Sequence, residues 1–175
     1  MSGTEVDGPL VQLMQQMSLR RHDHVQFTER QYISVLKRPV ESSGELFYDA
    51  PDRIEKRTLL PKPETMILDR GTVTIRRGTR NYTLALVDHP EIAPLIESIR
   101  ATLAGELPVI RSAYLLTFEG SPTDWTLTLV PRDARAIALV SQIRIAGLLD
   151  RIQEVEFKRA DGDRSVMTIA AEPVN

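Results

Sequence analysis

Short extended segments separated by tight turns constrain the fold of this chain more than any other feature. Between residues 45 and 87, apolar and polar side chains alternate with the period of two that is typical of β-strands. The runs are separated by the turn sequences Ala50-Pro51-Asp52, Pro61-Lys62-Pro63, Asp69-Arg70-Gly71 and Arg77-Gly78. A parallel strand pair needs a crossover of about a dozen residues or more, so connections this short predict an antiparallel meander.

The same pattern extends over most of the chain. We expect strands at residues 25–36, 45–48, 53–60, 64–68, 72–76 and 80–87, and again at 113–119, 125–130, 137–146, 152–159 and 165–171. Asp161-Gly162-Asp163 is a hairpin signal between the last two, since Asp-Gly tolerates the positive φ of such turns. The count is about ten or eleven antiparallel strands with no natural domain boundary, so residues 1–175 are expected to form one domain.

Two segments show a helical period instead. Residues 9–20 carry an apolar stripe at i, i+3, i+4 and i+7, formed by Leu10, Leu13, Met14 and Met17. Residues 92–104 carry a second stripe, formed by Ile92, Leu95, Ile96, Ile99 and Leu103, with Glu97, Arg100 and Thr102 away from it. We expect Pro9 in the first turn of the first helix and Gly105 at the end of the second.

Composition excludes several classes of protein. The chain has 22 Lys and Arg against 24 Asp and Glu, and only 5% of its residues are aromatic, which argues against a nucleic-acid groove. Cysteine is absent, so disulfides, thiolate metal sites and cysteine nucleophiles are excluded. No apolar run reaches the roughly 20 residues of a membrane span, and no signal peptide opens the chain. The opening Met1-Ser2-Gly3 is compatible with a start that replaces one.

Sequence signatures of catalysis are missing. There is no G-x-S-x-G elbow, no G-x-x-x-x-G-K-[ST] phosphate loop, no G-x-G-x-x-G and no H-E-x-x-H. Glu41 and Glu45 are close enough in sequence to suggest an acid–base pair, but glutamates at strand ends are most often solvated. The sequence therefore predicts a protein that is not an enzyme and has no cofactor.

Candidate metal ligands are few. In a strand, His22 and His24 share a face and would supply two ligands, but a catalytic zinc site usually draws on three protein ligands, and no third is indicated. A hydrolase that uses one of these histidines stays as an alternative. Asp161 and Asp163 lack the further carboxylates of a calcium loop. We therefore expect no metal site.

The amphipathic pattern leaves two interpretations of the interior. In the first, the sheet packs directly on the two helices and forms an ordinary α+β core. In the second, the sheet curls, as sheets of this size tend to do, and the helices cover an apolar cavity that suits acyl chains. The pattern alone favours the solid core, because core residues greatly outnumber pocket residues in most proteins.

Several short segments, taken in order, resemble a known family. Phe27-Thr28-Glu29 is similar to an F-T-Q sequence that starts a strand, and Ser43-Gly44-Glu45-Leu46-Phe47 to a G-x-G-[DE]-[LF]-aromatic strand. The segment from Pro63 to Gly71 resembles P-x-x-x-I-L-V-S-D-G. Together with an amphipathic helix before them and a later helix, D-G hairpin and short ending at residues 168–174, they resemble the LolA family of periplasmic lipoprotein carriers. The resemblance covers nearly the whole chain.

The resemblance implies a mainly β, α+β fold. A large curved antiparallel sheet would form an unclosed β-barrel, with the two amphipathic helices as a lid over a hydrophobic cavity. That cavity would shelter the acyl chains of lipoproteins, or of a related lipid, during transfer through the periplasm to the outer membrane. Shelter is needed because each exposed CH₂ costs about 0.8 kcal/mol. The implied partners are an inner-membrane ABC exporter and an outer-membrane acceptor, and the missing cysteine anchor fits a soluble carrier.

Departures from the family pattern identify further candidate residues. Ala50 stands where the family has an arginine that holds the lid closed, so we expect a lid held mainly by apolar contact unless Arg53 or Arg57 replaces that arginine. Ile54 and Lys56 stand where the family has tryptophans. The loss of the lid arginine favours the alternative of a carrier for a non-lipoprotein ligand, such as a pigment or an isoprenoid intermediate. The expected cavity lining is Leu13, Met17, Leu46, Ile54, Ile96, Ile99, Leu116 and Leu127.

Overall fold

One antiparallel sheet dominates the computed structural model, which describes residues 2–170 and, within α1, side chains from residue 8 onward. Its eleven strands are β1 (His22–Tyr32), β2 (Val40–Asp49), β3 (Arg53–Leu60), β4 (Glu64–Asp69), β5 (Thr72–Arg77), β6 (Arg80–Ala85), β7 (Tyr114–Gly120), β8 (Asp124–Pro131), β9 (Val140–Leu148), β10 (Arg151–Arg159) and β11 (Arg164–Ile169). The helices are α1 (Ser2–Leu19), η1 (Leu86–Asp88), α2 (Ala93–Ala104), α3 (Leu107–Ala113) and α4 (Ala134–Ile137).

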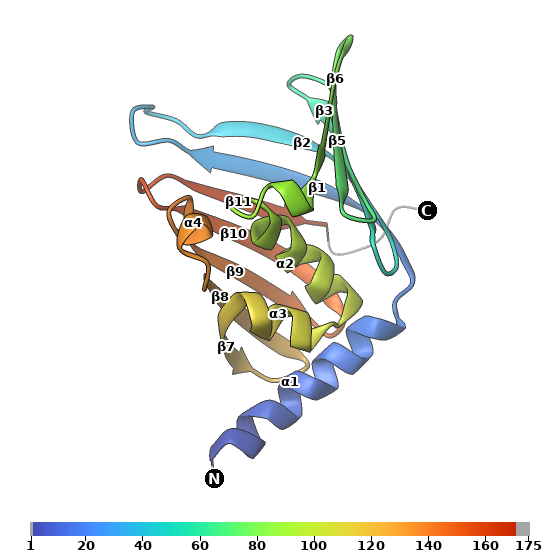
Figure 1. The fold of residues 1–175 in the computed structure, drawn as a ribbon, viewed down its shortest axis with the longest axis vertical. Coiled ribbons are helices and arrows are strands. Elements are labelled where there is room, and N and C mark those ends of the chain that lie inside the picture. Colours follow the sequence, from blue (N-terminus) through green and yellow to red (C-terminus); the bar gives the residue numbers. More distant parts are fainter. Residues whose placement is uncertain (1, 171–175) are drawn as a thin grey trace.

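The sheet bends but does not close. Its strand order is β6-β5-β4-β3-β2-β1-β11-β10-β9-β8-β7, so that β6 and β7 are free edges. In Figure 1, β5 and β6 are seen nearly edge-on and β8–β10 more nearly face-on, and α1, α2 and α3 lie on one side of the sheet. The predicted unclosed barrel with helices is therefore confirmed. The strand expected at 165–171 is β11 up to Ile169, and residues 171–174 lie outside the described residues.

Several elements differ from the expectation, among them β2, which begins at Val40 rather than at residue 45. β1 ends at Tyr32, so Val35 lies in the loop before β2, where 86% of it is exposed. Ile137, the first residue of the expected strand 137–146, is instead the end of the short helix α4, and β9 begins at Val140. Asp133 starts this helix, because it accepts hydrogen bonds from the backbone amides of Arg135 and Ala136. The sequence also gave no expectation of α3, whose seven residues are too few to show a helical period.

The two expected helices exist with changed boundaries. α1 begins at Ser2 rather than at residue 9, so Pro9 lies inside it and not in its first turn, and it has no backbone N–H to donate there. α2 ends as expected at Gly105, whose φ of 70° lies in the left-handed region that favours glycine. A Cβ at Gly105 would lie 2.1 Å from the carbonyl oxygen of Met14, so the turn after α2 touches the backbone of α1.

Buried apolar residues form a large cluster and a small one. In the large cluster, α1 and α3 pack against β7–β10, and the side chains of Leu13, Met17, Leu127, Ile143 and Ile145 are 0% exposed. The small cluster contains Leu68, Val73 and Leu86, with Ile54, Met66 and Ile96 packed against it. Between the two clusters lies an apolar cavity.

Candidate functional site: an apolar cavity beneath α2

A cavity of about 340 Å³ lies between α2 and the concave face of the sheet. This volume falls within the range of typical small-molecule sites, roughly 300–1,000 Å³. Its walls are mainly aliphatic and aromatic side chains of α2, β1–β4, β10 and β11. The apolar lining consists of Val25, Leu46, Phe47, Tyr48, Ile54, Met66, Leu68, Leu95, Ile96, Ile99, Leu103, Ile152, Val155, Phe157, Met167, Ile169 and Ala170.

The structure divides the eight residues expected to line the cavity into two groups. Leu46, Ile54, Ile96 and Ile99 lie in its wall. Leu13, Met17 and Leu127 are instead 0% exposed in the large core cluster, and Leu116 packs against the same cluster. All eight side chains face the interior as their periodicity indicates. For the second group, α1 and its neighbours fill the interior and leave no cavity.

The sequence analysis missed the contribution of β10 and β11. Phe157, Met167 and Ile169 line the cavity because β11 pairs with β1, which places Ile169 opposite Phe27. This pairing joins the end of the chain to its beginning, and no local pattern predicts it. Met66 and Leu68 could have been predicted, because the short turn at residues 61–63 makes β3 and β4 neighbours. The structure places these two residues opposite Lys56 and Ile54.

Two charged side chains interrupt the apolar wall. The ammonium of Lys56 lies 3.1 Å from Oε1 of Glu29, and the hydroxyl of Ser165 donates to Oε2 of the same carboxylate at 3.0 Å. Lys56 also lies 5.4 Å from the centroid of the Phe27 ring. The side chains of Lys56 and Glu29 are 25% and 12% exposed.

A second charged group lies where α1 meets β1. Asp23 and Asp150 line the cavity, and Arg20 binds both of them, with nitrogen–oxygen distances of 3.2 and 3.0 Å. Arg151 and Gln153 complete the polar part of this wall. The carboxylates here are therefore paired with an arginine that comes directly after α1.

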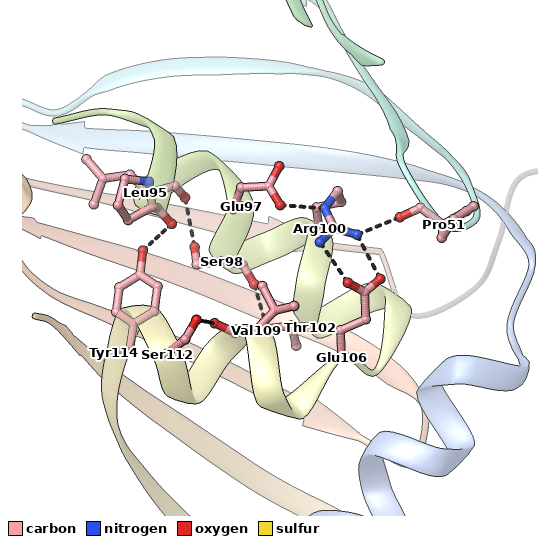
Figure 2. Close-up of polar contacts among 11 residues, drawn as sticks. Pro51, Leu95, Glu97, Ser98, Arg100, Thr102, Glu106, Val109, Ser112 and Tyr114 are labelled. Carbon is pink, nitrogen blue, oxygen red and sulfur yellow. Dashed lines mark hydrogen bonds and ion pairs between the residues drawn. The ribbon is translucent and has the colours of Figure 1, made fainter. Parts of the chain in front are cut away.

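A single arginine ties α2 to the sheet (Figure 2). Nη1 of Arg100 donates to the carbonyl oxygen of Pro51, in the β2–β3 turn, at 2.9 Å. The same guanidinium binds both oxygens of Glu106 at 2.9 Å and donates from Nε to Glu97 at 2.7 Å. Hydrogen bonding to Glu106 raises the pKa of Arg100 above its usual value, so its charge is permanent. We call α2 the lid helix and the Arg100–Pro51 bond the lid contact.

Tyr114 holds the other end of the lid helix. Its hydroxyl donates to the carbonyl oxygen of Pro94, in the first turn of α2 (Figure 2). The side chain is 1% exposed, and burial raises the pKa of this phenol above its usual value. Tyr114 therefore stays protonated and remains a donor at neutral pH.

The arginine contact differs from the one expected. Ala50 only donates its backbone amide to the carbonyl of Arg21, at 2.8 Å. Arg53 and Arg57 lie on the face of β3 opposite Ile54 and Lys56, away from the lid helix, and both bind Glu55. A polar contact to this turn is instead donated by Arg100 of α2, to the carbonyl oxygen of Pro51. That the lid is held mainly by apolar contact stays a prediction.

The other candidate residues have ordinary partners. His22 lies 2.7 Å from Asp49, and the ring of His24 stacks on Phe47 with 4.1 Å between centroids. Glu41 pairs with Arg30, and Asp161 accepts from the backbone amide of Asp163 in the β10–β11 turn. Among the side chains that the structure describes, no group of three or more His, Asp or Glu is placed to hold a metal ion. Within the same residues, no helix has the length and apolarity that a membrane crossing requires.

An unclosed antiparallel barrel with helices over an apolar cavity defines a class of small carrier and binding domains. The chain matches the family described as "Outer membrane lipoprotein carrier protein LolA-like" over residues 3–173, and it belongs to this LolA-like family. The family is by its description one of lipoprotein carriers. Among curated proteins, none matches the sequence.

Solved structures support the same fold. A LolA superfamily protein from Nitrosomonas europaea aligns with a TM-score of 0.50 and 9% identity, over 97% of this chain and 93% of its own. An outer membrane lipoprotein-sorting protein domain from Vibrio parahaemolyticus aligns with a TM-score of 0.51 and 8% identity, over 97% of this chain and 92% of its own. At such low identities the likeness concerns the fold alone.

Proposed function

We propose that this protein is a periplasmic carrier that shelters the acyl chains of a lipoprotein, or of a related lipid, on the way to the outer membrane. The observation that carries the proposal is the apolar cavity of about 340 Å³ beneath the lid helix. Moving an acyl chain from water into the cavity is favourable by about 0.8 kcal/mol for each CH₂ buried. Aliphatic walls that include two methionines also accept flexible chains. In this role the protein binds and releases its ligand and catalyses no reaction.

The lid contact suits a carrier that must both retain and release. A hydrogen bond to a charged group contributes about 1.5–3 kcal/mol, enough to favour the closed state and small enough to break. The chain has no nucleotide-binding signature, so loading would depend on a partner, which the family resemblance suggests is an inner-membrane ABC exporter. Release would require an outer-membrane acceptor that binds the ligand more tightly. Such a carrier acts as a chaperone for its ligand.

Identification of the bound molecule tests the proposal. The protein is recovered from cells without detergent, and native mass spectrometry and lipid extraction then identify what it carries. We expect an acylated species, either a lipoprotein or a glycerolipid. A pigment or an isoprenoid would favour the alternative carrier. An empty protein that also fails to bind a fluorescent fatty-acyl probe would contradict the carrier function.

A further inference from the structure

The cavity wall contains one ion pair that its packing does not require. Lys56 lies opposite Leu46 on β2 and Met66 on β4, so apolar side chains flank it on both sides. Removing two charges from water costs several kcal/mol, and hydrophobic residues of similar volume are often equally stable in such places. The Lys56–Glu29 pair is therefore poorly explained by stability, and its position in the wall indicates contact with a ligand.

The ammonium of Lys56 has unused donors. A lysine ammonium has three N–H groups, and within the described part of the chain its one hydrogen-bond acceptor is Oε1 of Glu29. The aromatic ring of Phe27 lies beneath it, at 5.4 Å. Lys56 can therefore donate to a ligand in the cavity without leaving Glu29.

The charge of Glu29 decides which acceptor fits best. Lys56 and Glu29 together are neutral, and Ser165 donates to the second oxygen of Glu29. A ligand carboxylate would place two negative charges beside one ammonium in an apolar cavity, where uncompensated charge is costly. The carbonyl oxygen of an ester or an amide accepts a charge-assisted hydrogen bond and leaves the pair neutral.

We propose, on the basis of the carrier function above, that Lys56 held by Glu29 binds the carbonyl oxygen of an acyl ester or amide. The cavity thereby prefers acylated molecules to free fatty acids and to plain hydrocarbons. The shared chemistry has two sources, a glycerolipid and the acylated end of a lipoprotein. Glu29 is a positioning residue in this arrangement, because it neutralises and orients Lys56.

Displacement of a fluorescent fatty-acyl probe by three ligands of one chain length tests the proposal. The ligands are methyl oleate, oleate and octadecene. For the unchanged protein, we expect methyl oleate to bind roughly 10- to 100-fold more tightly than octadecene, the range that one hydrogen bond to a charged group supplies. Lys56→Met should lose this preference, whereas Lys62→Met, in the exposed β3–β4 turn, should keep it.

Glu29→Gln should change which ligand is preferred, an effect that a purely structural role of Glu29 would not produce. Without the carboxylate, the charge of Lys56 is no longer compensated, so the preference should shift from methyl oleate to oleate. Thermal unfolding of each variant checks that it is folded. A Lys56→Met protein that still prefers methyl oleate, or a Glu29→Gln protein with unchanged selectivity, would overturn the proposal.

Two further comparisons distinguish a glycerolipid from a lipoprotein as the ligand, and failure of the Lys56 proposal from failure of the carrier function. Dioleoylglycerol and a synthetic diacylated lipopeptide offer the same esters without and with a peptide, and the tighter of the two identifies the source. If the unchanged protein binds all three simple ligands equally, the role of Lys56 is wrong while the carrier function stands. If it binds none of them, the carrier function fails, and the role of Lys56 fails with it.

Discussion

The two halves of the sheet carry similar alternating strands but enclose different interiors. Where α1 and α3 cover β7–β10, the side chains interlock, and those of Leu127 and Ile145, which face each other across β8 and β9, are 0% exposed. Where α2 covers β1–β4, the equivalent inward side chains, such as Leu46 and Ile54, surround the cavity. The same sequence pattern thus produces a solid core in one half and a hollow one in the other.

The helices account for much of the difference. The stripe of α1 is entirely buried, with exposures of 0–3% for Leu10, Leu13, Met14 and Met17. The stripe of α2 is only half-buried, because Leu95, Ile96, Ile99 and Leu103 face the cavity. A cavity therefore arises where the apolar stripe of a helix faces the sheet without filling the space between them.

The largest expected effect compares truncations in the two halves. Leu127→Ala should lower the free energy of unfolding by about 3 kcal/mol, because it creates a void in a fully packed core. Leu46→Ala should cost about 1 kcal/mol, because its side chain already borders empty space. Urea unfolding of both variants measures the difference. Equal losses would show that the two halves are packed alike.

The next effect concerns the lid contact. Arg100→Gln removes a guanidinium that is 10% exposed at the side chain and binds Pro51, Glu97 and Glu106. We expect α2 to open more readily by about 2 kcal/mol, seen as roughly 30-fold faster hydrogen exchange of its amides. Amides of β8 and β9 should be unchanged. Arg135→Gln is the control, since the side chain of Arg135 is 64% exposed and binds Asp133 at the start of α4. If the two variants change the exchange of the α2 amides equally, Arg100 does not hold α2 in place.

Filling the cavity should weaken binding without weakening the fold. Leu46→Trp places an indole in the space beneath the lid helix, so an acyl probe should bind at least about tenfold more weakly. The free energy of unfolding should stay the same or rise. Leu115→Trp, at a position on β7 that is 55% exposed, is the matched control. Probe binding that survives Leu46→Trp would place the ligand elsewhere.

The smallest effect lies on the outer face of the hollow half. Burial of Glu55 opposes its ionisation, but hydrogen bonds from Arg57 and Arg53 outweigh burial and hold its pKa below the usual 4.5. A carboxyl with a lowered pKa stabilises the folded state above its usual pKa, and this contribution disappears as pH falls through the folded value. Glu55→Gln should therefore lower stability at pH 7 by less than about 1 kcal/mol. The gap to the unchanged protein should close below pH 4.5, and a gap constant with pH would contradict this account.

Local patterns predicted the elements better than they predicted the site. β3 was predicted to the residue at 53–60, because its alternation and both flanking turns are local signals. The inward direction of Leu46 and Leu127 followed from the same signals, but the cavity beside one of them depends on how far each helix lies from the sheet. Arg100 was placed off the apolar stripe of its helix, as expected of a solvated residue, yet it is 8% exposed. Its partner Pro51 is 49 residues away, and no local pattern contains that distance.

The strand order has a consequence for how the cavity can be entered. β6 and β7 follow each other in the chain but form the two edges of the sheet, so η1, α2 and α3 bridge the gap as a strap fixed at both ends. In the middle of the sheet, β1 pairs with β11, and every other pair of neighbouring strands is consecutive in the chain. Because this segment is joined to an edge strand at each end, it cannot rotate away from the sheet about a single hinge. In the proposed carrier, we therefore expect ligand entry to require either an outward movement of α2 or a wider separation of the edge strands β6 and β7.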